Sequence, residues 1–434
     1  MSDLHDRLER LRQAGRLNRH PSPPPAPPPM APPAPPSLSP RPLSPAARPL
    51  PLSALTDLPG TEVVQGSGGN FLLRTVRHEL GHSQGRVRVG DLLDLPGEYG
   101  AIAANDPEMT GLDFRRMVFI DTETSGLAGG TGTIVFLTGV GRFEEDGYVV
   151  RQYFARTPAE EPAYLPHLAA LLKEATGLVS FNGKAFDLPL LRTRYLMAGL
   201  RPPNLTLPHL DLLHPARRLW RLRLGACNFG RLEAEVLGHE RGGQDVPSWL
   251  IPDLWFRFAA GENNVDDMAQ VLYHNLHDIL SMAPLAHVLC ATFGGAIDPH
   301  PGDLLALAHS HAARGRHTQA EAAYRRALAD PLRPEQRPVA LAGLAASLKH
   351  QERQDEAAVW WQALAELEPP EVEPYIELAK YYEWESKDLA AALAWTLKAG
   401  AAVQQWRPGY QRAQALAEIE HRRERLARKL GEEG

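Results

Sequence analysis

Short apolar runs mark the centre of the chain, and each run ends at a polar or glycine-rich segment. The clearest runs cover residues 117–120, 134–138 and 178–181. Their length and their β-branched and aromatic residues predict buried strands. Helix-period segments follow them, the longest at 268–289. Strands that alternate with helices are typical of an α/β domain, which we expect over residues 116–293.

The pattern changes to alanine-rich helix pairs in the last third of the chain. Large and small residues recur there at the offsets of the tetratricopeptide repeat, whose period is about 34 residues. One unit contains Ala320 and Ala327, and a second contains Ala357 and Trp361. We therefore expect an all-α tetratricopeptide-like domain over residues 300–430, with a charged capping helix at its end and a groove that binds a protein partner.

Three segments precede the α/β domain. Residues 1–20 are charged and compatible with a short helix. Residues 21–52 are about half proline and hold few large apolar side chains, so we expect a disordered, extended linker. Residues 53–115 contain short strand-like pieces and turns, which predict an N-terminal elaboration of the α/β domain.

Acidic residues at three places in the α/β pattern indicate metal chemistry. Asp121 and Glu123 end the first strand, and side chains two residues apart in a strand share a face. Such carboxylates are costly to ionise together without a cation between them. Asp187 opens a helix after the next motif, where a simple N-cap is the alternative, and Asp278 lies in mid-helix, where Asp is disfavoured. Oxygen ligands of this kind suit Mg²⁺ or Mn²⁺.

These motifs resemble those of the DEDD 3′–5′ exonucleases in the ribonuclease-H-like superfamily. They are Asp-x-Glu at 121–123, Asn-x-x-x-Phe-Asp at 182–187 and His-x-x-x-Asp at 274–278. Asp-Thr-Glu-Thr-Ser-Gly-Leu at 121–127 and Gly-Gly-Thr-Gly-Thr at 129–133 resemble the YprB-like branch more narrowly. The resemblance implies a mixed five-stranded sheet flanked by helices and a hydrolase acting on nucleic acid.

The resemblance also implies a two-metal reaction at the 3′ end of single-stranded DNA or RNA. Two Mg²⁺ or Mn²⁺ ions would clamp the attacking and leaving oxygens. Asp121 would bridge both ions, Glu123 and Asp278 would complete one site, and Asp187 would hold the second.

The reaction needs a group that deprotonates the attacking water. We prefer His274, because it lies four residues before Asp278 on the same helix face and because histidine as a residue type suits proton transfer at neutral pH better than tyrosine. Tyr273 is the alternative. Relatives use a tyrosine with three intervening residues or a histidine with four, and this chain departs from both patterns.

Candidate nucleic-acid contacts lie in two places. They are Arg217, Arg218, Trp220, Arg221 and Arg223 in one arginine-rich segment, and Asn182 and Lys184 in the second motif. Guanidinium groups fit phosphate oxygens, and an indole can stack on a base. A solvated helix face is an equally good interpretation of the arginine-rich segment.

Composition limits the remaining choices. A chain of 434 residues with 44% hydrophobic content can build two or three domains. The net charge of −6 argues against a uniformly basic surface but allows a local basic groove. Two cysteines predict no disulfide framework and a reducing cytoplasm. No apolar run approaches the ~18 residues of a membrane span, so we expect no membrane partner.

Two functions fit this sequence. The first is a metal-dependent 3′–5′ exonuclease that its helical repeats recruit to a protein partner. The second is an inactive nucleic-acid-binding or scaffold protein that keeps the ribonuclease-H-like fold. All four carboxylates are present, which favours the first, and the irregular third motif is the sequence hint for the second.

Overall fold

The computed structural model describes residues 49–126 and 132–433. The expected helix at 1–20, all but the last residues of the proline-rich segment at 21–52, and residues 129–131 of the glycine-rich motif lie outside the described residues. All elements below belong to one compact unit, Leu43–Gly434.

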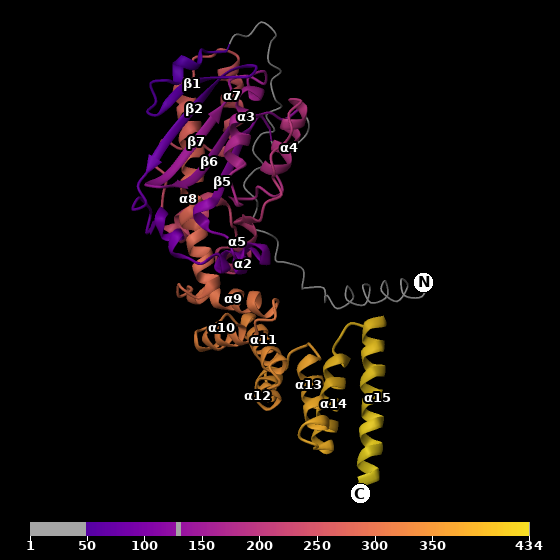
Figure 1. The fold of residues 1–434 in the computed structure, drawn as a ribbon. Helices are drawn as coiled ribbons and strands as arrows, with labels where there is room; N and C mark the ends of the chain where they lie inside the picture. The colour runs from indigo at the N-terminus through magenta and orange to yellow at the C-terminus, as the bar shows by residue number, and fades with distance from the viewer. Residues whose placement is uncertain (1–48, 127–131, 434) are drawn as a thin grey trace. The chain divides into compact units, whose positions relative to one another are not determined.

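A seven-stranded mixed sheet forms the α/β part of the protein, with the strand order β1-β2-β7-β6-β5-β8-β9 (Figure 1). The strands are β1 (Thr61–Gly66), β2 (Gly69–His78), β5 (Met117–Thr124), β6 (Val135–Glu144), β7 (Gly147–Phe154), β8 (Gly177–Ser180) and β9 (His209–Asp211). β5, β8 and β9 run parallel, and the other neighbours are antiparallel. We expected five strands. β1 and β2, from the 53–115 segment, add two more beyond β7, and β3 (Ser83–Gln84) and β4 (Val87–Arg88) form a separate hairpin.

Helices cover both faces of this sheet. They are α2 (Gly97–Ala104), α3 (Glu161–Leu172), α4 (Asp187–Met197), α5 (Leu213–Leu224), α6 (Phe229–Leu232), α7 (Ile251–Ala259) and α8 (Val265–Gly294), with the π-helix η5 (Glu233–Leu237) after α6. Short 3₁₀ turns are η1 (Leu52–Leu55), η2 (Val89–Asp94), η3 (Pro107–Met109), η4 (Phe114–Arg116), η6 (Ser248–Leu250) and η7 (Pro301–Asp303). The mixed sheet between helices confirms the expected fold class of this region.

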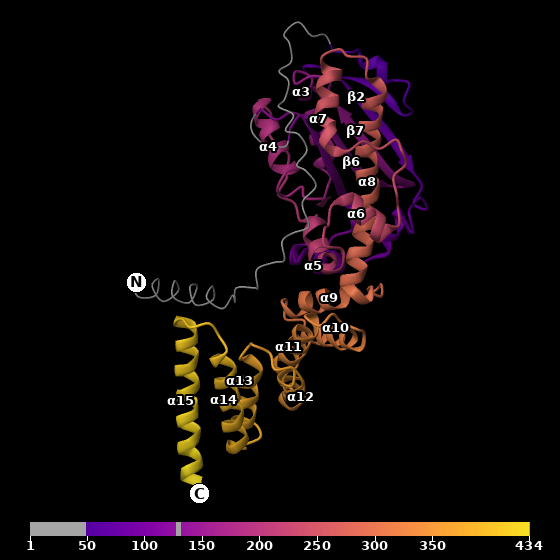
Figure 2. The same cartoon turned by 180° about the vertical axis from the view of Figure 1, so that it is seen from behind.

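The alternation of side chains along β5 decides which helix each residue meets. Phe119 packs in one core with Leu276 and Ile279 of α8, whereas Val118 and Ile120 pack in the core that lies under α3 and α4. Figure 2 shows α8 crossing the sheet on the face opposite α3 and α4. Because the period of a strand is two, Asp121 must point toward α8 and Thr122 toward α4.

Helix α8 is the central helix of the domain. It is an exception to the expectation that no segment of the chain is apolar enough to span a membrane. It is long and apolar enough to cross a membrane by length and composition alone, but 78% of its most apolar window is buried inside the protein. Met268, Leu280 and Leu289 are among its buried residues. The helix therefore fits a core position. The sequence analysis predicted the helix but not its membrane-like hydropathy, because scattered polar residues interrupt its apolar runs.

The last part of the chain is all-helical, as expected. Its helices are α9 (Leu304–Ala312), α10 (His317–Ala329), α11 (Gln336–His350), α12 (Gln354–Ala365), α13 (Glu373–Trp384), α14 (Leu389–Gln404) and α15 (Tyr410–Glu433). Successive helices pack on one another around a main core and a second, smaller cluster of Leu389, Ala392 and Leu426 at the last helices. A β-carbon at Gly343 would lie 2.3 Å from the ring of Tyr324, so close packing of α10 on α11 requires glycine there. The specific tetratricopeptide assignment stays a prediction.

A buried carboxylate attaches the last helix, α15, to the helix pair before it. The side chain of Glu383 is 0% exposed and pairs with Arg422, Arg425 and Lys429 of α15 at 3.2, 2.6 and 2.9 Å. A carboxylate without solvent depends on such partners for its charge. The three cations therefore fix where α15 packs on α13.

We predict that Glu383→Gln loosens α15 by about 2 kcal/mol, because charge-assisted hydrogen bonds are lost from a buried position. Limited trypsin digestion should then cut within α15 roughly 30-fold faster than in the wild type, since every 1.4 kcal/mol is a factor of about ten. Glu420→Gln is the matched control, since Glu420 is 52% exposed and pairs with Arg423 of the same helix. Equal cleavage of both variants would contradict the attachment role of Glu383.

Candidate active site

The carboxyl end of β5 carries the first two candidate ligands. Asp121 and Glu123 are half-buried and point toward α8 from alternate positions of the strand. The register between β5 and β6 shifts at Glu123 and Thr124, and such bulges re-aim side chains beside functional sites. The strand therefore delivers two carboxylates to one face just where its regular pairing ends.

A buried amide chain fixes Asp121. Asn275 Nδ2 on α8 donates to Asp121 Oδ2 at 2.9 Å. Gln152 Nε2 on β7 donates to Asn275 Oδ1 at 3.0 Å and to the carbonyl of Leu272 at 2.8 Å. A β-carbon at Gly139 of β6 would lie 2.2 Å from Asn275 Oδ1. The bare backbone at Gly139 therefore allows α8 to approach the sheet closely enough to hold Asp121.

Helix α8 adds His274 and Asp278, which lie four residues apart on one helix face. Ligand atoms of Glu123, His274 and Asp278 all lie within 4.8 Å of one another, and they are the one such set of three among the residues that the structure describes. Two carboxylates and one imidazole at this separation can hold a divalent cation.

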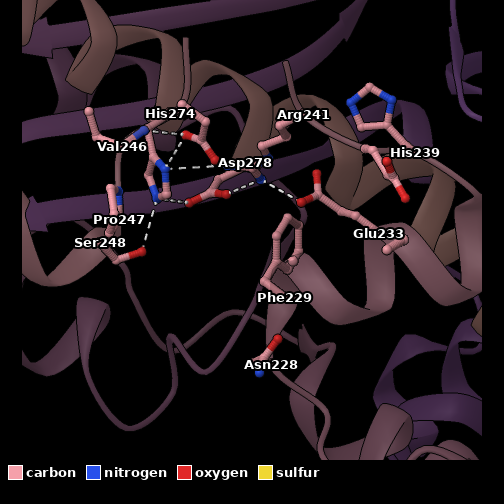
Figure 3. Close-up of a pocket in the computed structure, with 14 residues that line it drawn as sticks. Asn228, Phe229, Glu233, His239, Arg241, Val246, Pro247, Ser248, His274 and Asp278 are labelled. Carbon is pink, nitrogen blue, oxygen red and sulfur yellow. Dashed lines mark hydrogen bonds and ion pairs between the residues drawn. The ribbon is translucent and has the colours of Figure 1, made fainter. Parts of the chain in front are cut away.

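His274 is held from both ring nitrogens (Figure 3). Its Nδ1 lies 2.6 Å from Asp245 Oδ1, and its Nε2 lies 3.2 Å from Ser248 Oγ and 3.4 Å from Asp278 Oδ2. A carboxylate on one nitrogen orients the imidazole and strengthens the other nitrogen as a base or a metal ligand. Asp245 thus makes His274 suitable for either role.

Arg241 supplies the positive charge of the site. Its guanidinium pairs with Glu233 at 2.8 Å, with Asp278, and with Asp245 at 3.6 Å, while its side chain is 9% exposed. Carboxylates around this buried guanidinium raise its pKa against the effect of burial. Arg241 is therefore a permanent cation that offsets the charge of Asp278 (Figure 3).

The second motif brings Asp187 to the opposite side of β5. Asp187 opens α4 and accepts a hydrogen bond from the hydroxyl of Thr122. The preceding loop is tied to Asp211 at the end of β9, which accepts from the backbone N–H groups of Asn182 at 2.7 Å and Lys184 at 3.0 Å. Asp187 therefore lies beside the ligand set rather than within it.

The carboxylates affect one another's protonation. Burial raises the pKa of Asp121 and of Glu123 well above their ordinary values, and Asp278 raises both further. Burial also raises the pKa of Asp187 to about 6, against the hydrogen bond from Thr122. A cation would reverse these shifts by stabilising the charged forms.

A cavity of about 470 Å³ opens beside this cluster. His274, Asp278 and Arg241 line one side of it, and Asn228 and Phe229 at the start of α6 line another (Figure 3). The cavity places space for a ligand directly against the candidate cation position. The arrangement can bind an anionic group between Arg241 and a metal ion.

The arginine-rich segment is α5, and most of it serves the fold. Trp220 is 2% exposed in the core, so the expectation that it stacks on a base is wrong. The guanidinium of Arg218 donates to the carbonyl of Ala103, and that of Arg223 pairs with Asp303 at 2.7 Å. The amphipathic period of α5 puts Trp220 on the buried face with Leu219 and Leu224, whereas Arg218 and Arg223 are half-buried.

The remaining predicted contacts are accessible. Arg217 and Arg221 are exposed on the outer face of α5, Lys184 is exposed, and Asn182 is half-buried in the motif loop with a positive φ of 71°. Tyr273 is half-buried, and its ring packs on His277 at 4.1 Å between centroids. Among the described residues, Tyr273 does not belong to the ligand set.

Sequence reasoning missed several residues of the site. They are Asn275, Gln152, Arg241, Asp245, Ser248 and the exposed Phe186, which is 57% accessible beside Asp187. Asn275 stands next to His274 and three residues before Asp278, so its place on α8 was a usable signal. Arg241 and Asp245 lie in a polar loop without periodicity, and nothing in the sequence points to them.

Comparison with known proteins agrees with this geometry. The RNase_H superfamily model matches residues 118–290. The chain belongs to the ribonuclease H superfamily, and this membership indicates a nucleic-acid-processing nuclease. It is also similar to the uncharacterized protein YprB of Bacillus subtilis (strain 168), with 32% identity over 329 residues that cover 74% of this chain and 78% of the relative.

We predict that Mn²⁺ stabilises the protein more strongly as the pH rises from about 5 to about 8. Asp187 has a native pKa of about 6, above the ordinary value of 3.8, so the native state binds more protons than the unfolded state between about pH 4 and about pH 7. The metal-free protein therefore loses stability with rising pH, whereas the metal binds better to deprotonated ligands. Thermal unfolding with millimolar Mn²⁺ or EDTA should show a shift of about 5 °C near pH 8.

Glu123→Gln should abolish most of that shift without lowering the Tm in EDTA, because it removes a buried like charge. Asp57→Asn, at an exposed position whose side chain has no ion pair among residues 49–126 and 132–433, should respond to Mn²⁺ as the wild type does. Equal Mn²⁺ shifts in Glu123→Gln and the wild type would count against the candidate cation site.

Proposed function

We propose that the protein is a metal-dependent 3′–5′ exonuclease of the DEDD type that hydrolyses phosphodiester bonds. The observation that carries this proposal is the meeting of Glu123, His274 and Asp278 beside Asp121 and Asp187. Carboxylates that raise one another's pKa at the end of a strand are costly unless a bound cation uses them. The superfamily supplies the nuclease chemistry that such a site would perform.

The residues present fit Mg²⁺ or Mn²⁺, by their oxygen and imidazole donors and by their separation. Glu123 and Asp278 would hold one ion, and Asp121 would bridge to a second that Asp187 completes after leaving the hydroxyl of Thr122. Ions at these positions would polarise the phosphate and lower the pKa of the attacking water. Arg241 would contact the phosphate oxygens in the adjoining cavity.

His274 is the proposed general base. Asp245 holds Nδ1, so the Nε2 atom, which faces Asp278 and Ser248, is the one free to accept a proton. Asp245 acts through His274 and is a positioning residue, because it stabilises the imidazolium that forms. In the same position, His274 would alternatively bind a cation directly.

The exonuclease is tested with the purified chain on 3′- and 5′-labelled single-stranded DNA and RNA, in Mn²⁺, Mg²⁺ and EDTA. We expect a ladder that recedes from the 3′ end and needs the metal. Asp121→Asn should lower the rate at least ~10³-fold and His274→Gln about 10²-fold to 10⁴-fold. Asp57→Asn is the matched control and should keep wild-type activity.

The outcome separates the two functions that the sequence allowed. A ladder that is absent from Asp121→Asn supports the enzyme and identifies its nucleic acid. Binding of the same strands without cleavage under any metal would instead establish a nucleic-acid-binding or scaffold protein. Cleavage inside the strand would correct the reaction to an endonuclease.

Phe186 is a proposed stacking surface for the terminal base. It is 57% exposed and directly precedes Asp187, and Lys184 is exposed in the same loop. Stacking of one base on an aromatic ring contributes about 1–3 kcal/mol. Both side chains therefore suit a strand whose end enters the site.

We predict that Phe186→Ala raises KM for single-stranded substrate about tenfold and changes kcat little, because the ring binds a base and takes no part in the chemistry. Steady-state cleavage kinetics measure this. Tyr410→Ala, which removes an aromatic ring that is 81% exposed on α15, is the control and should leave KM unchanged. An unchanged KM in Phe186→Ala would remove the stacking role.

The helical repeats are proposed to bind a protein partner as well. Val359, Trp384 and Leu397 are large apolar side chains that are 60%, 50% and 53% exposed on them. Large apolar side chains that form a contiguous exposed patch are typical of interaction surfaces. A cytoplasmic location remains a prediction from the sequence.

A further inference from the structure

A basic groove lies where α5 meets the first repeat helices. It encloses about 600 Å³. Arginines and exposed apolar side chains from both regions line it, and the six that matter here are Arg217, Arg221, Leu222, His309, Arg333 and Val339. The groove is separate from the cavity beside His274, with which it shares no lining residue.

The α5 wall carries uncompensated positive charge. Arg217 and Arg221 lie one helical turn apart on the exposed face, and neither has an ion pair in the described part of the chain. Arg218 lies behind them, where burial and the nearby Arg314 lower its pKa to about 10. It is still protonated at neutral pH and adds to the positive potential of this wall.

The opposite wall comes from α11 and the turn before it. Arg333 is 59% exposed and lies 3.5 Å from Glu335, which is itself 66% exposed. An ion pair this open to water is weak, so Arg333 remains available to another anion. Leu222 and Val339, at 40% and 45% exposure, give the groove an apolar floor.

Specific contacts attach the first repeat helix, α9, to the α/β region, and α11 packs on α9 and α10. Arg223 of α5 pairs with Asp303 at 2.7 Å, and Arg314 Nε, just after α9, donates to Asn105 Oδ1 at 2.8 Å. Leu307 of α9 is buried in the core of the α/β region. The groove is therefore a built feature of the protein.

We propose that this groove binds the phosphate backbone of single-stranded nucleic acid, at a distance from the end being cleaved. Guanidinium groups fit phosphate oxygens. Helix α5 begins at Leu213, two residues after Asp211, whose carboxylate holds the loop that carries Lys184. Twelve residues of α5 span about 18 Å, so one helix joins the candidate active site to the groove.

Two observations favour a nucleic acid over an acidic peptide. Arg217 and Arg221 lie on the helix that starts beside the loop of Lys184, and the four arginines of the lining face one acidic residue, Glu335. His309 is the one aromatic ring in the lining, so base stacking is sparse and binding should be independent of sequence. The first repeats thus form part of the substrate path. The inference rests on the proposed function for the identity of the substrate.

The test is the affinity of the full chain for a fluorescein-labelled single strand in EDTA, measured by anisotropy over a salt series. Arg217→Gln with Arg221→Gln should weaken binding about tenfold and reduce the slope of log K against log salt by about 1.4, since each phosphate contact on a single strand contributes about 0.7. Arg333→Gln should reduce it by about 0.7. The matched control is Arg407→Gln with Arg428→Gln, two exposed arginines elsewhere, which should leave the slope unchanged.

Cleavage of strands of increasing length in Mn²⁺ supplies the second readout. The double variant should lose kcat/KM on long strands and keep it on the shortest strand that is cut. The inference would be overturned if the double variant had the same salt slope and the same length dependence as the wild type. It would also be overturned if the wild type bound an acidic peptide but no nucleic acid. Absence of cleavage together with an arginine-dependent slope would overturn the exonuclease and leave the groove assignment standing.

Discussion

The arrangement of this protein depends on holding several carboxylates together in a poorly solvated place. Asp121, Glu123 and Asp278 repel one another, and burial raises the pKa of the first two. The chain offsets part of this cost with the buried guanidinium of Arg241 and the amide of Asn275. A bound cation would relieve this repulsion, so the repulsion increases the free energy gained on binding. The same electrostatic constraint therefore accounts for the raised pKa values and for the proposed chemistry.

Sequence patterns located the strand β5 and the helix α8 because their apolar periods are long and regular. Asp121, Glu123 and Asp278 could be named for the same reason, since each stands at a fixed place on such an element. Arg241 and Asp245 could not, because they reach the site through a loop that carries no period. Trp220 was misplaced because its charged neighbours hid the buried face of α5, and only packing against the core reveals that face.

The repeat region shows a second limit of pattern reasoning. Offsets of small and large residues predicted the helix pairs, and Gly343 against Tyr324 shows why those offsets matter. These offsets did not predict where the first helix pair attaches to the α/β region. That attachment depends on Arg223, Asp303 and Leu307, whose contacts join separate domains of the sequence. A protein-docking module and a substrate-binding wall are therefore compatible uses of different parts of one helical stack.

The chain has two cysteines, and both lie in the α/β region as free, buried thiols. Cys290 is 0% exposed on α8, about three turns beyond Asp278, and burial raises the pKa of its thiol. An alkylating reagent can reach it only when α8 separates from the sheet. The repeats contain no thiol. Modification rates therefore report the opening of the α/β region alone, which makes these thiols a chemical probe of how firmly α8 is held on the sheet.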